Sequence, residues 1–316
     1  MGTVCYGVAS VVYLVAASVP ALVLGRVVHG VGLANYTTAA SAYLADIAPP
    51  ARRGEAIGFF SAAQGLGLIT GPAIGFIVIS TFGFPQLFYL ITALAVVATV
   101  VSLFAKERRS APARRPRWTL RTGIVAPEAL PVTWVALCLG LAFGPVMAFL
   151  AIFAQGRGVA NPGFFFTVQA IALILSRTFA GYLADRWGRV VVAVPGIVAL
   201  SASLVLLPGA AGLAQFLLSA AFFGLGFGMA QPATMALLVD RVRPEQRGLA
   251  MSTYFTGFDI GISVGSIGFG ALLASIDIGA MWLLAAACVL LGLPGLWADR
   301  RAGSERRTAT LRRFSP

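Results

Sequence analysis

The chain has 316 residues, of which 59% are hydrophobic and 11% are charged, and its formal net charge is +12. Ordinary soluble domains contain about 45–50% apolar and about 25% charged residues, so this composition excludes a soluble globular protein. The positive charge does not indicate a nucleic-acid binder, because such a protein needs a basic face on a soluble module. Here the basic residues lie between long apolar stretches.

Apolar stretches follow one another along nearly the whole chain. A helix that crosses a membrane needs about 20 consecutive apolar residues. About ten stretches reach this length, at residues 2–20, 21–46, 55–80, 86–105, 131–153, 163–184, 189–207, 211–239, 249–274 and 279–298. The sequence therefore predicts an all-α, polytopic integral membrane protein with about ten transmembrane helices.

Basic residues are distributed unevenly between the loops. Twenty of the 23 Lys and Arg residues lie in alternate loops and in the C-terminal tail, whereas the opposite loops hold essentially only Arg157. Loops rich in Lys and Arg remain in the cytoplasm. We therefore expect a multi-pass protein of the plasma membrane with both termini in the cytoplasm, and contacts between its basic loops and anionic lipids.

The longest polar segment is rich in Arg and Pro, shows no hydrophobic periodicity and separates four apolar stretches from six. We interpret it as a linker between two helical bundles. The expected organisation is a partial N-terminal bundle at 1–105, a cytoplasmic linker at 106–130, a six-helix C-terminal bundle at 131–298 and a basic cytoplasmic tail at 299–316.

The two halves contain a repeat. The pattern Asp46-x-x-x-Pro50-x-x-Arg53-Gly54 recurs 194 residues later, from Asp240 to Gly248, and the same offset aligns Gly30, Gly67 and Gly71 with Gly224, Gly261 and Gly265. Parallel repeats of spanning helices are typical of one class of secondary transporter. The apolar stretches at 131–153 and 163–184 have no counterpart at this offset. The sequence therefore predicts a first bundle that lacks two helices.

The second apolar stretch contains the motif Arg26-x-x-His29-Gly30-x-Gly32. An arginine inside a span is costly unless it is paired or faces a cavity, so Arg26 is a functional candidate. Its alternative role is snorkelling to the membrane surface. His29 is the sole histidine. An imidazole titrates near neutral pH and suits a proton carrier, with a structural role as the alternative.

The third apolar stretch contains Gly67-x-x-x-Gly71-Pro72-x-x-Gly75. Small residues every four positions let two helices approach closely, and Pro72 removes a backbone donor and bends the helix. Generic helix packing is the plainer explanation of the same pattern.

A polar motif, GYLADRWGR, follows the sixth apolar stretch from Gly181 to Arg189. Its glycines permit a tight turn, and Asp185 and Arg189 can form a charge-assisted network with Asp240. The alternative is that these residues only end helices and set topology. Related charged positions beside the two copies of the repeat are Asp46, Arg53 and Arg247. No first-half copy of GYLADRWGR is present, so Asp46 lacks the partners that Asp240 is expected to have.

Taken together, these motifs resemble the major facilitator superfamily over essentially the whole chain, which is similar to helices three to twelve of a twelve-helix member. The resemblance implies two bundles around a midplane cavity. It implies a conformational latch at Gly181–Arg189 and its partners, a part for Arg26 in proton coupling, and an antiporter-type motif at Gly67–Gly75. Phe76 departs from the family's usual double glycine.

Asp259 aligns with Gly65 in the repeat, so the second half places a carboxylate where the first half has none. It lies ten positions beyond the expected helix start near Leu249, or roughly 15 Å into the membrane at about 1.5 Å per residue. Arg177, on the sixth stretch, is a candidate partner. The hypothesis is that the two residues form a switchable pair that loads a proton or a substrate charge. A permanently closed structural pair is the alternative.

Other side chains are spaced to face the central cavity. They are uncharged polar or aromatic residues, with packing as their alternative role: Asn35, Tyr36, Thr37 and Gln231, joined by Tyr254 and Phe255.

These observations predict transport of a small molecule by alternating access. The glycine-proline motif favours proton-coupled efflux of a drug-like or amphipathic compound. The alternatives are proton-coupled uptake of a sugar or metabolite, and a truncated membrane fragment that does not transport.

The sequence contains no ligand cluster, nucleophile constellation or phosphate-binding loop, so we expect no enzymatic activity, metal or cofactor. The expected partners are a small-molecule substrate, protons and the lipid bilayer, without nucleic acid, and the chain is expected to be a monomer.

Overall fold

The computed structural model describes residues 1–47, 53–105, 126–243 and 246–296, apart from several side chains between positions 38 and 69. Within these residues the regular elements are ten α-helices and one short 3₁₀-helix, with no strand. The all-α fold predicted from the sequence is therefore confirmed. The expected linker and the basic tail lie mostly outside the described residues, so the structure does not test them.

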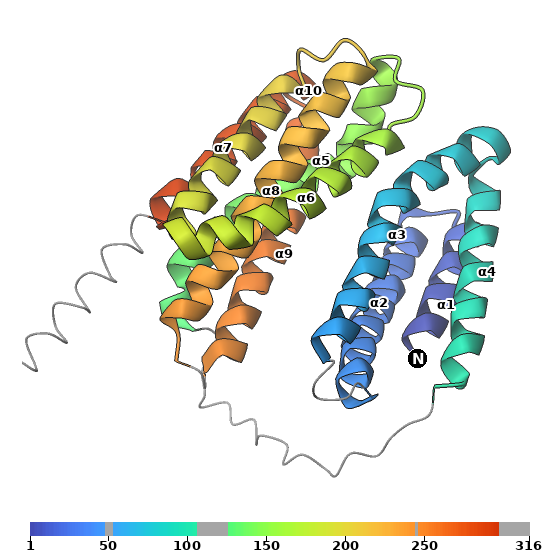
Figure 1. Ribbon diagram of the computed structural model, residues 1–316. Helices are drawn as coiled ribbons and strands as arrows, with labels where there is room; N and C mark the ends of the chain where they lie inside the picture. The colour runs from blue at the N-terminus through green and yellow to red at the C-terminus, as the bar shows by residue number, and fades with distance from the viewer. Residues whose placement is uncertain (48–52, 106–125, 244–245, 297–316) are drawn as a thin grey trace, which may run out of the picture. The chain divides into compact units, whose positions relative to one another are not determined.

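The chain divides into two compact units, Met1–Arg117 and Trp118–Pro316. The first unit contains four helices, drawn from blue to cyan in Figure 1: α1 (Gly2–Val15), α2 (Val19–Ile47), α3 (Arg53–Phe82) and α4 (Phe84–Leu103). Helix α1 packs against both α2 and α4. Only Gly83 separates α3 from α4, and its φ of 96° is a conformation that glycine adopts without strain. Pro85 then lies in the first turn of α4, where its missing N–H costs nothing.

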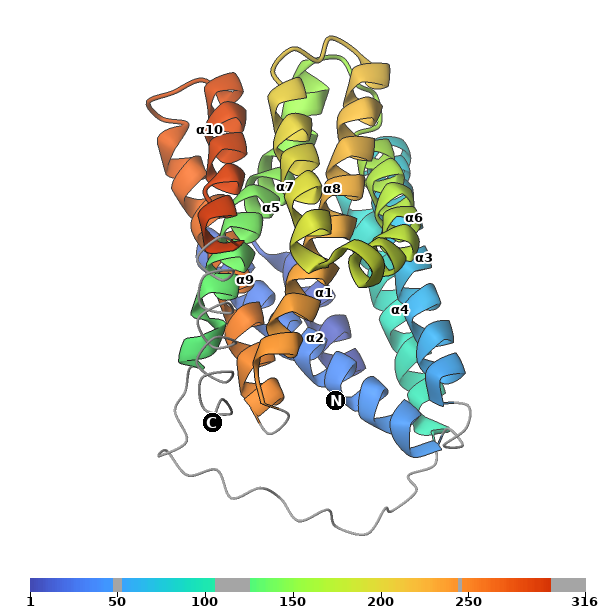
Figure 2. The same ribbon diagram turned by 60° about the vertical axis from the view of Figure 1, so that its left-hand side comes forward.

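The second unit contains six helices, seen from another side in Figure 2. They are α5 (Leu130–Gly156), α6 (Gly163–Trp187), α7 (Arg189–Leu206), α8 (Leu213–Arg241), α9 (Arg247–Leu272) and α10 (Ile278–Leu290). Helix α5 packs chiefly against α9, and α8 packs against both α6 and α7. Inside the unit, the rings of Phe143, Phe227 and Phe258 meet with centroids 5.2 and 5.7 Å apart.

Glycines set the close contacts between these helices. A Cβ on Gly261 of α9 would collide with the carbonyl oxygen of Leu137 on α5, and one on Gly224 of α8 would collide with the carbonyl oxygen of Gln169 on α6. Lipid tails are as apolar as leucine, so helices in a bilayer associate through such close packing rather than through a hydrophobic driving force. The absence of a side chain at these glycines is therefore a requirement of the fold.

The repeat predicted from the sequence is confirmed by the helix boundaries. Helix α2 spans 19–47 and α8 spans 213–241, an offset of 194 residues at both ends. Helices α3 and α9 begin at 53 and 247, and α4 and α10 begin at 84 and 278, which is the same offset. In the described part of the chain, seven helices are long and apolar enough to cross a membrane by length and composition, and two shorter apolar helical segments accompany them: Gly2–Val15, which is α1, and Thr70–Phe82, which belongs to α3.

We predict that Gly261→Ala destabilises the second unit, because its methyl group would strike the backbone of α5. Overpacking of this kind costs about 1–3 kcal/mol. The matched control is Gly268→Ala on the same helix, where a Cβ would meet nothing within 4 Å. Alanine at that position is neutral or stabilises by up to about 1 kcal/mol through its helix propensity. Thermal unfolding in detergent measures both variants, and equal melting temperatures would contradict the close α5–α9 contact.

Candidate functional site

Three charged side chains meet where α6, α7 and α8 end or begin. Arg189, the first residue of α7, places Nη1 2.5 Å from Asp185 Oδ1 of α6 and Nε 3.3 Å from Asp240 Oδ2 of α8. Asp185 and Asp240 are largely exposed, with side-chain exposed fractions of 71% and 57%. One guanidinium thus ties three helix ends together at the surface of the unit, as the sequence motif predicts.

The tight turn that positions Arg189 depends on Gly188. Its φ of 99° lies in a region that residues with a Cβ rarely adopt, and it is the sole residue between α6 and α7. Gly181, earlier in the motif, has open space around its Cα, and Arg247 is exposed at the start of α9. Asp46 lies in α2 and Arg53 begins α3, but their side chains lie outside the described residues.

Arg177 lies on α6 and pairs with an amide. Its Nη2 donates a hydrogen bond to Oε1 of Gln231 on α8, at 2.9 Å. Gln231 is buried, with 8% of its surface exposed. The Gln231 amide is uncharged, so this hydrogen bond holds the Arg177 guanidinium in place within the span without neutralising its positive charge.

Asp259 lies on α9 and is exposed. Among the ion pairs of the described residues, none joins Asp259 to Arg177, and its carboxylate has no hydrogen-bond partner there. Only its backbone carbonyl accepts a bond, from Ser263 Oγ at 2.9 Å. In this conformation Arg177 and Asp259 are therefore two separate charges on the second unit.

Tyr254 and Phe255 are neighbours with different environments. Tyr254 is fully buried in the second unit, and its hydroxyl lies 2.8 Å from Thr234 Oγ1 of α8. The expectation that it faces a cavity is not met in this structure, because the helix turns its ring into the packed interior. Phe255 is 41% exposed and stands at right angles to the Tyr254 ring.

The motif on α2 lies in an aromatic cluster of the first unit. The guanidinium of Arg26 sits 5.7 Å from the centre of the Tyr13 ring of α1. A cation over an aromatic face is stabilised by about 0.5–1 kcal/mol when exposed. The His29 ring meets Tyr6 edge-on, with centroids 5.0 Å apart. Arg26 and His29 therefore contact aromatic rings of α1.

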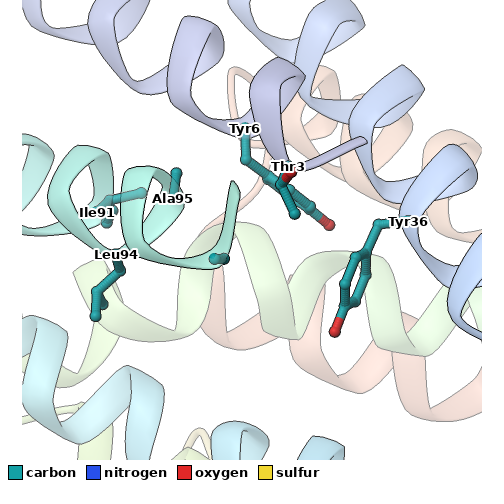
Figure 3. A pocket seen from close by; sticks show the side chains of 7 residues that line it. Thr3, Tyr6, Tyr36, Ile91, Leu94 and Ala95 are labelled. Carbon is teal, nitrogen blue, oxygen red and sulfur yellow. The ribbon is translucent and has the colours of Figure 1, made fainter. Parts of the chain in front are cut away.

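Asn35, Tyr36 and Thr37, further along α2, have different surroundings. Asn35 and Thr37 donate hydrogen bonds to the backbone carbonyls of Val31 and Leu33, each at 2.8 Å. Tyr36 instead lines an open pocket of about 260 Å³ in the first unit. Figure 3 shows its ring opposite Tyr6 and Thr3 of α1, beside apolar side chains of α4.

The glycine-proline motif lies inside α3. Helix α3 continues through Pro72, and a Cβ on Gly75 would meet only Leu87 of α4, at 4.0 Å, among the described residues. A Cβ on Gly67 or Gly71 would meet nothing within 4 Å in the described part of the chain. Among the described residues, these two glycines therefore make no close contact with another helix.

The pairing of Arg177 with Gln231 was not foreseen, although the sequence holds a sign of it. Each residue lies ten positions before the end of its helix, at 187 for α6 and 241 for α8. Helix α7 runs back between them, so α6 and α8 run in the same direction and the two polar groups reach the same depth. The described residues hold no group of three or more His, Cys, Asp or Glu side chains that could bind a metal ion.

A duplicated set of apolar helices, with charged residues at helix ends and a few inside spans, is typical of polytopic secondary transporters. The model of the Major Facilitator Superfamily matches this chain at residues 1–174 and again at 132–315. The chain therefore belongs to the Major Facilitator Superfamily.

Two relatives match along most of their length. One is an uncharacterized MFS-type transporter, MJ1560, of Methanocaldococcus jannaschii, which is 25% identical over 295 residues, covering 90% of this chain and 76% of that protein. The other is an uncharacterized MFS-type transporter, STM4428, of Salmonella typhimurium, 28% identical over 291 residues, covering 90% and 74%.

A third relative matches over a shorter part. The multidrug resistance protein MdtG of Klebsiella pneumoniae is 31% identical over 153 residues, or 46% of this chain and 37% of that protein. Among solved structures, the peptide transporter POT in complex with sulfate superimposes with a TM-score of 0.75 at 15% identity, covering 96% of this chain and 79% of that chain. At this identity the likeness concerns the fold alone.

We predict that Arg189→Gln lowers the free energy of unfolding by no more than about 1 kcal/mol, because exposed ion pairs contribute about 0–1 kcal/mol. Arg186→Gln is the control, since Arg186 bonds only the hydroxyl of Tyr182, at 3.1 Å. Chemical unfolding in detergent measures both. A loss of several kcal/mol at Arg189 alone would mean that the three-residue network is a main support of the fold.

Proposed function

We propose that this transporter exports small amphipathic or drug-like compounds across the plasma membrane in exchange for protons. The observation that carries the proposal is Asp259, an exposed carboxylate inside an apolar helix with no hydrogen-bond or ion-pair partner among the described residues. Ionisable groups inside membrane spans are costly and generally functional. A carboxylate without a partner is free to take up a proton or a cationic substrate group.

Two observations support efflux as the direction. The motif Gly67-x-x-x-Gly71-Pro72-x-x-Gly75 resembles that of antiporters. In addition, multidrug resistance proteins MdtG of several bacteria are 28–31% identical over about half of this chain. The substrate class proposed here follows these two observations together.

In the proposed transport cycle, Arg177 is the positively charged group that acts together with Asp259. Gln231 holds the guanidinium by one hydrogen bond, so the cation remains available to an anionic or polar group that enters beside it. Protonation of Asp259 neutralises its carboxylate and leaves the positive charge of Arg177. The affinity of the site for a charged substrate therefore changes. A ligand or proton shifts a conformational equilibrium only by its difference in affinity for the two states.

We propose that the charged network of Asp185, Arg189 and Asp240 acts as a conformational latch. It links the ends of three helices and is weak enough to open, since exposed ion pairs contribute little to stability. A transition between two access states needs such a contact, made in one state and broken in the other.

We propose that both termini lie in the cytoplasm. The excess of Lys and Arg in alternate loops supports cytoplasmic positions for both termini. We also propose that the protein acts as a monomer and that its own chemistry is confined to binding, without catalysis of a covalent step.

We predict that Asp259→Asn abolishes proton-driven accumulation of a fluorescent amphipathic dye in everted vesicles. The neutral amide cannot exchange a proton, so the imposed pH gradient loses its effect on transport. The control is Asp277→Asn, because Asp277 caps the start of α10 by accepting bonds from the N–H groups of Gly279 and Ala280. That variant is expected to retain the pH dependence.

Three results would count against this function. Unchanged pH dependence in Asp259→Asn would remove the proton role, and dye leaving the energised vesicles would reverse the direction to uptake. Absence of any gradient-driven flux with a broad panel of dyes would show that the 316-residue chain does not transport such compounds by itself.

A further inference from the structure

Two of the three cysteines lie on neighbouring helices of the second unit. Cys138 is on α5 and Cys288 is on α10, and α10 packs against α5 (Figure 2). Both thiols are free, and they are close enough to interact electrostatically. The third cysteine, Cys5, is on α1 of the first unit. The proposed transport function uses none of these thiols.

Contacts between α5 and the last apolar span, Ile278–Leu296, show which way Cys138 faces. A Cβ on Gly295 would lie 2.7 Å from the carbonyl oxygen of Pro131, and a Cβ on Gly292 would lie 3.4 Å from Cys138 Cβ. As α5 advances from Pro131 to Cys138, its contact on the last span moves back from Gly295 to Gly292. The two helices are therefore antiparallel, and Cys138 faces α10.

Two further contacts hold this register. Trp134 Nε1 donates a hydrogen bond to the carbonyl oxygen of Leu291 at 2.8 Å. Val135 Cγ1 lies 3.5 Å from the Cβ position of Gly292. The register between α5 and the last span is therefore fixed at several successive positions.

Cys288 lies one helical turn before Gly292. The chain remains helical between them, since the N–H of Leu291 bonds the carbonyl oxygen of Ala287 at 3.2 Å. Residues four apart in a helix lie on the same face, with Cβ atoms about 5–6 Å apart. Because the helices are antiparallel, the turn that follows the Gly292 contact along α5 is the turn that carries Cys288. Cys138 therefore faces the side of α10 on which Cys288 lies.

The two thiols differ in access. Cys138 is 1% exposed, whereas Cys288 is only partly buried. On the same side of α10, Leu284 and Leu291 are 45% and 55% exposed. A charged metal ion pays a large desolvation cost in such apolar surroundings. A neutral compound that dissolves in the membrane avoids this cost, so it reaches Cys288 first and then Cys138 behind it.

We infer that Cys138 and Cys288 form a two-thiol binding site for neutral compounds of trivalent arsenic. Thiol groups prefer soft acceptors, and trivalent arsenic is one that bonds two sulfurs at once. With an organic arsenic oxide, each sulfur forms one As–S bond while the bonds between arsenic and oxygen break. The oxygen leaves as water with both thiol protons, so no oxidant or reductant is required. The product is an uncharged bridge between α5 and α10, and the inference does not depend on the proposed transport activity.

The test measures how much phenylarsine oxide the 316-residue chain retains in native membranes. After labelling, excess glutathione removes arsenic bound through one sulfur, whereas arsenic bound through two sulfurs remains until dithiothreitol releases it. Mass spectrometry of the intact protein measures the adduct. We expect one equivalent on the unchanged chain and none on Cys138→Ala or Cys288→Ala.

The matched control is Cys5→Ala, because the first unit contains no second cysteine beside Cys5. This variant is expected to retain the full equivalent. The melting temperature in detergent without the reagent shows that each variant is folded. With the reagent, it is expected to rise for the unchanged chain and for Cys5→Ala but not for Cys288→Ala, since a bridge between distant residues restricts the unfolded chain as a disulfide does.

Three outcomes would overturn the inference. The unchanged chain could retain no arsenic after glutathione, which would show that the two thiols do not bind one arsenic together. Folded Cys288→Ala could retain as much as the unchanged chain, which would remove Cys288 from the site. Loss of the adduct in folded Cys5→Ala would assign the bridge to a different pair of thiols.

Discussion

Close approach between helix backbones is the interaction on which the rest of this structure depends. In a bilayer every backbone N–H and C=O must be satisfied within its own element, which permits helices and excludes open irregular backbone. Helices so formed have no hydrophobic reason to associate, and they gain contact energy by packing closely through small residues. Gly224, Gly261 and Gly265 provide that approach in the second unit, where α5 and α6 lie directly on α8 and α9. The buried aromatic and aliphatic residues then fill the space that these contacts define.

The same constraint explains where the charged residues lie. In the described part of the chain most charged residues lie at or near helix ends, and Arg189 joins three such ends through Asp185 and Asp240. The charges within spans are few, so each has a particular environment. Arg177 is held by the amide of Gln231, Arg26 by the ring of Tyr13, and the carboxylate of Asp259 has no partner among the described residues.

The two repeats have diverged in chemistry as well as in helix number. The first repeat carries aromatic rings and a histidine around Arg26, whereas the second carries an arginine, an amide and a carboxylate. In the second unit Gly224, Gly261 and Gly265 lie against neighbouring backbones, while a Cβ on their counterparts Gly30, Gly67 and Gly71 would meet nothing within 4 Å among the described residues.

The sequence by itself determined the helices, their repeat and the family. Bilayer thickness sets the length of an apolar span, so eight of the predicted spans match their helices within a few residues, whereas α1 ends at Val15 rather than near position 20 and α10 ends at Leu290 rather than near position 298. The 194-residue repeat needs only an alignment of the chain with itself. The ion pair of Asp185 and Arg189 was also foreseen, because the two residues are four positions apart and their geometry is local.

Only the tertiary structure decided which side chains meet across helices. Arg177 bonds Gln231 rather than Asp259, Tyr254 turns inward, and Gly67 and Gly71 have no neighbour among the described residues. None of these follows from spacing along the chain. The direction of a side chain around a helix axis relative to its neighbours depends on the rotation and crossing of whole helices. Those quantities are set by contacts between residues far apart in sequence.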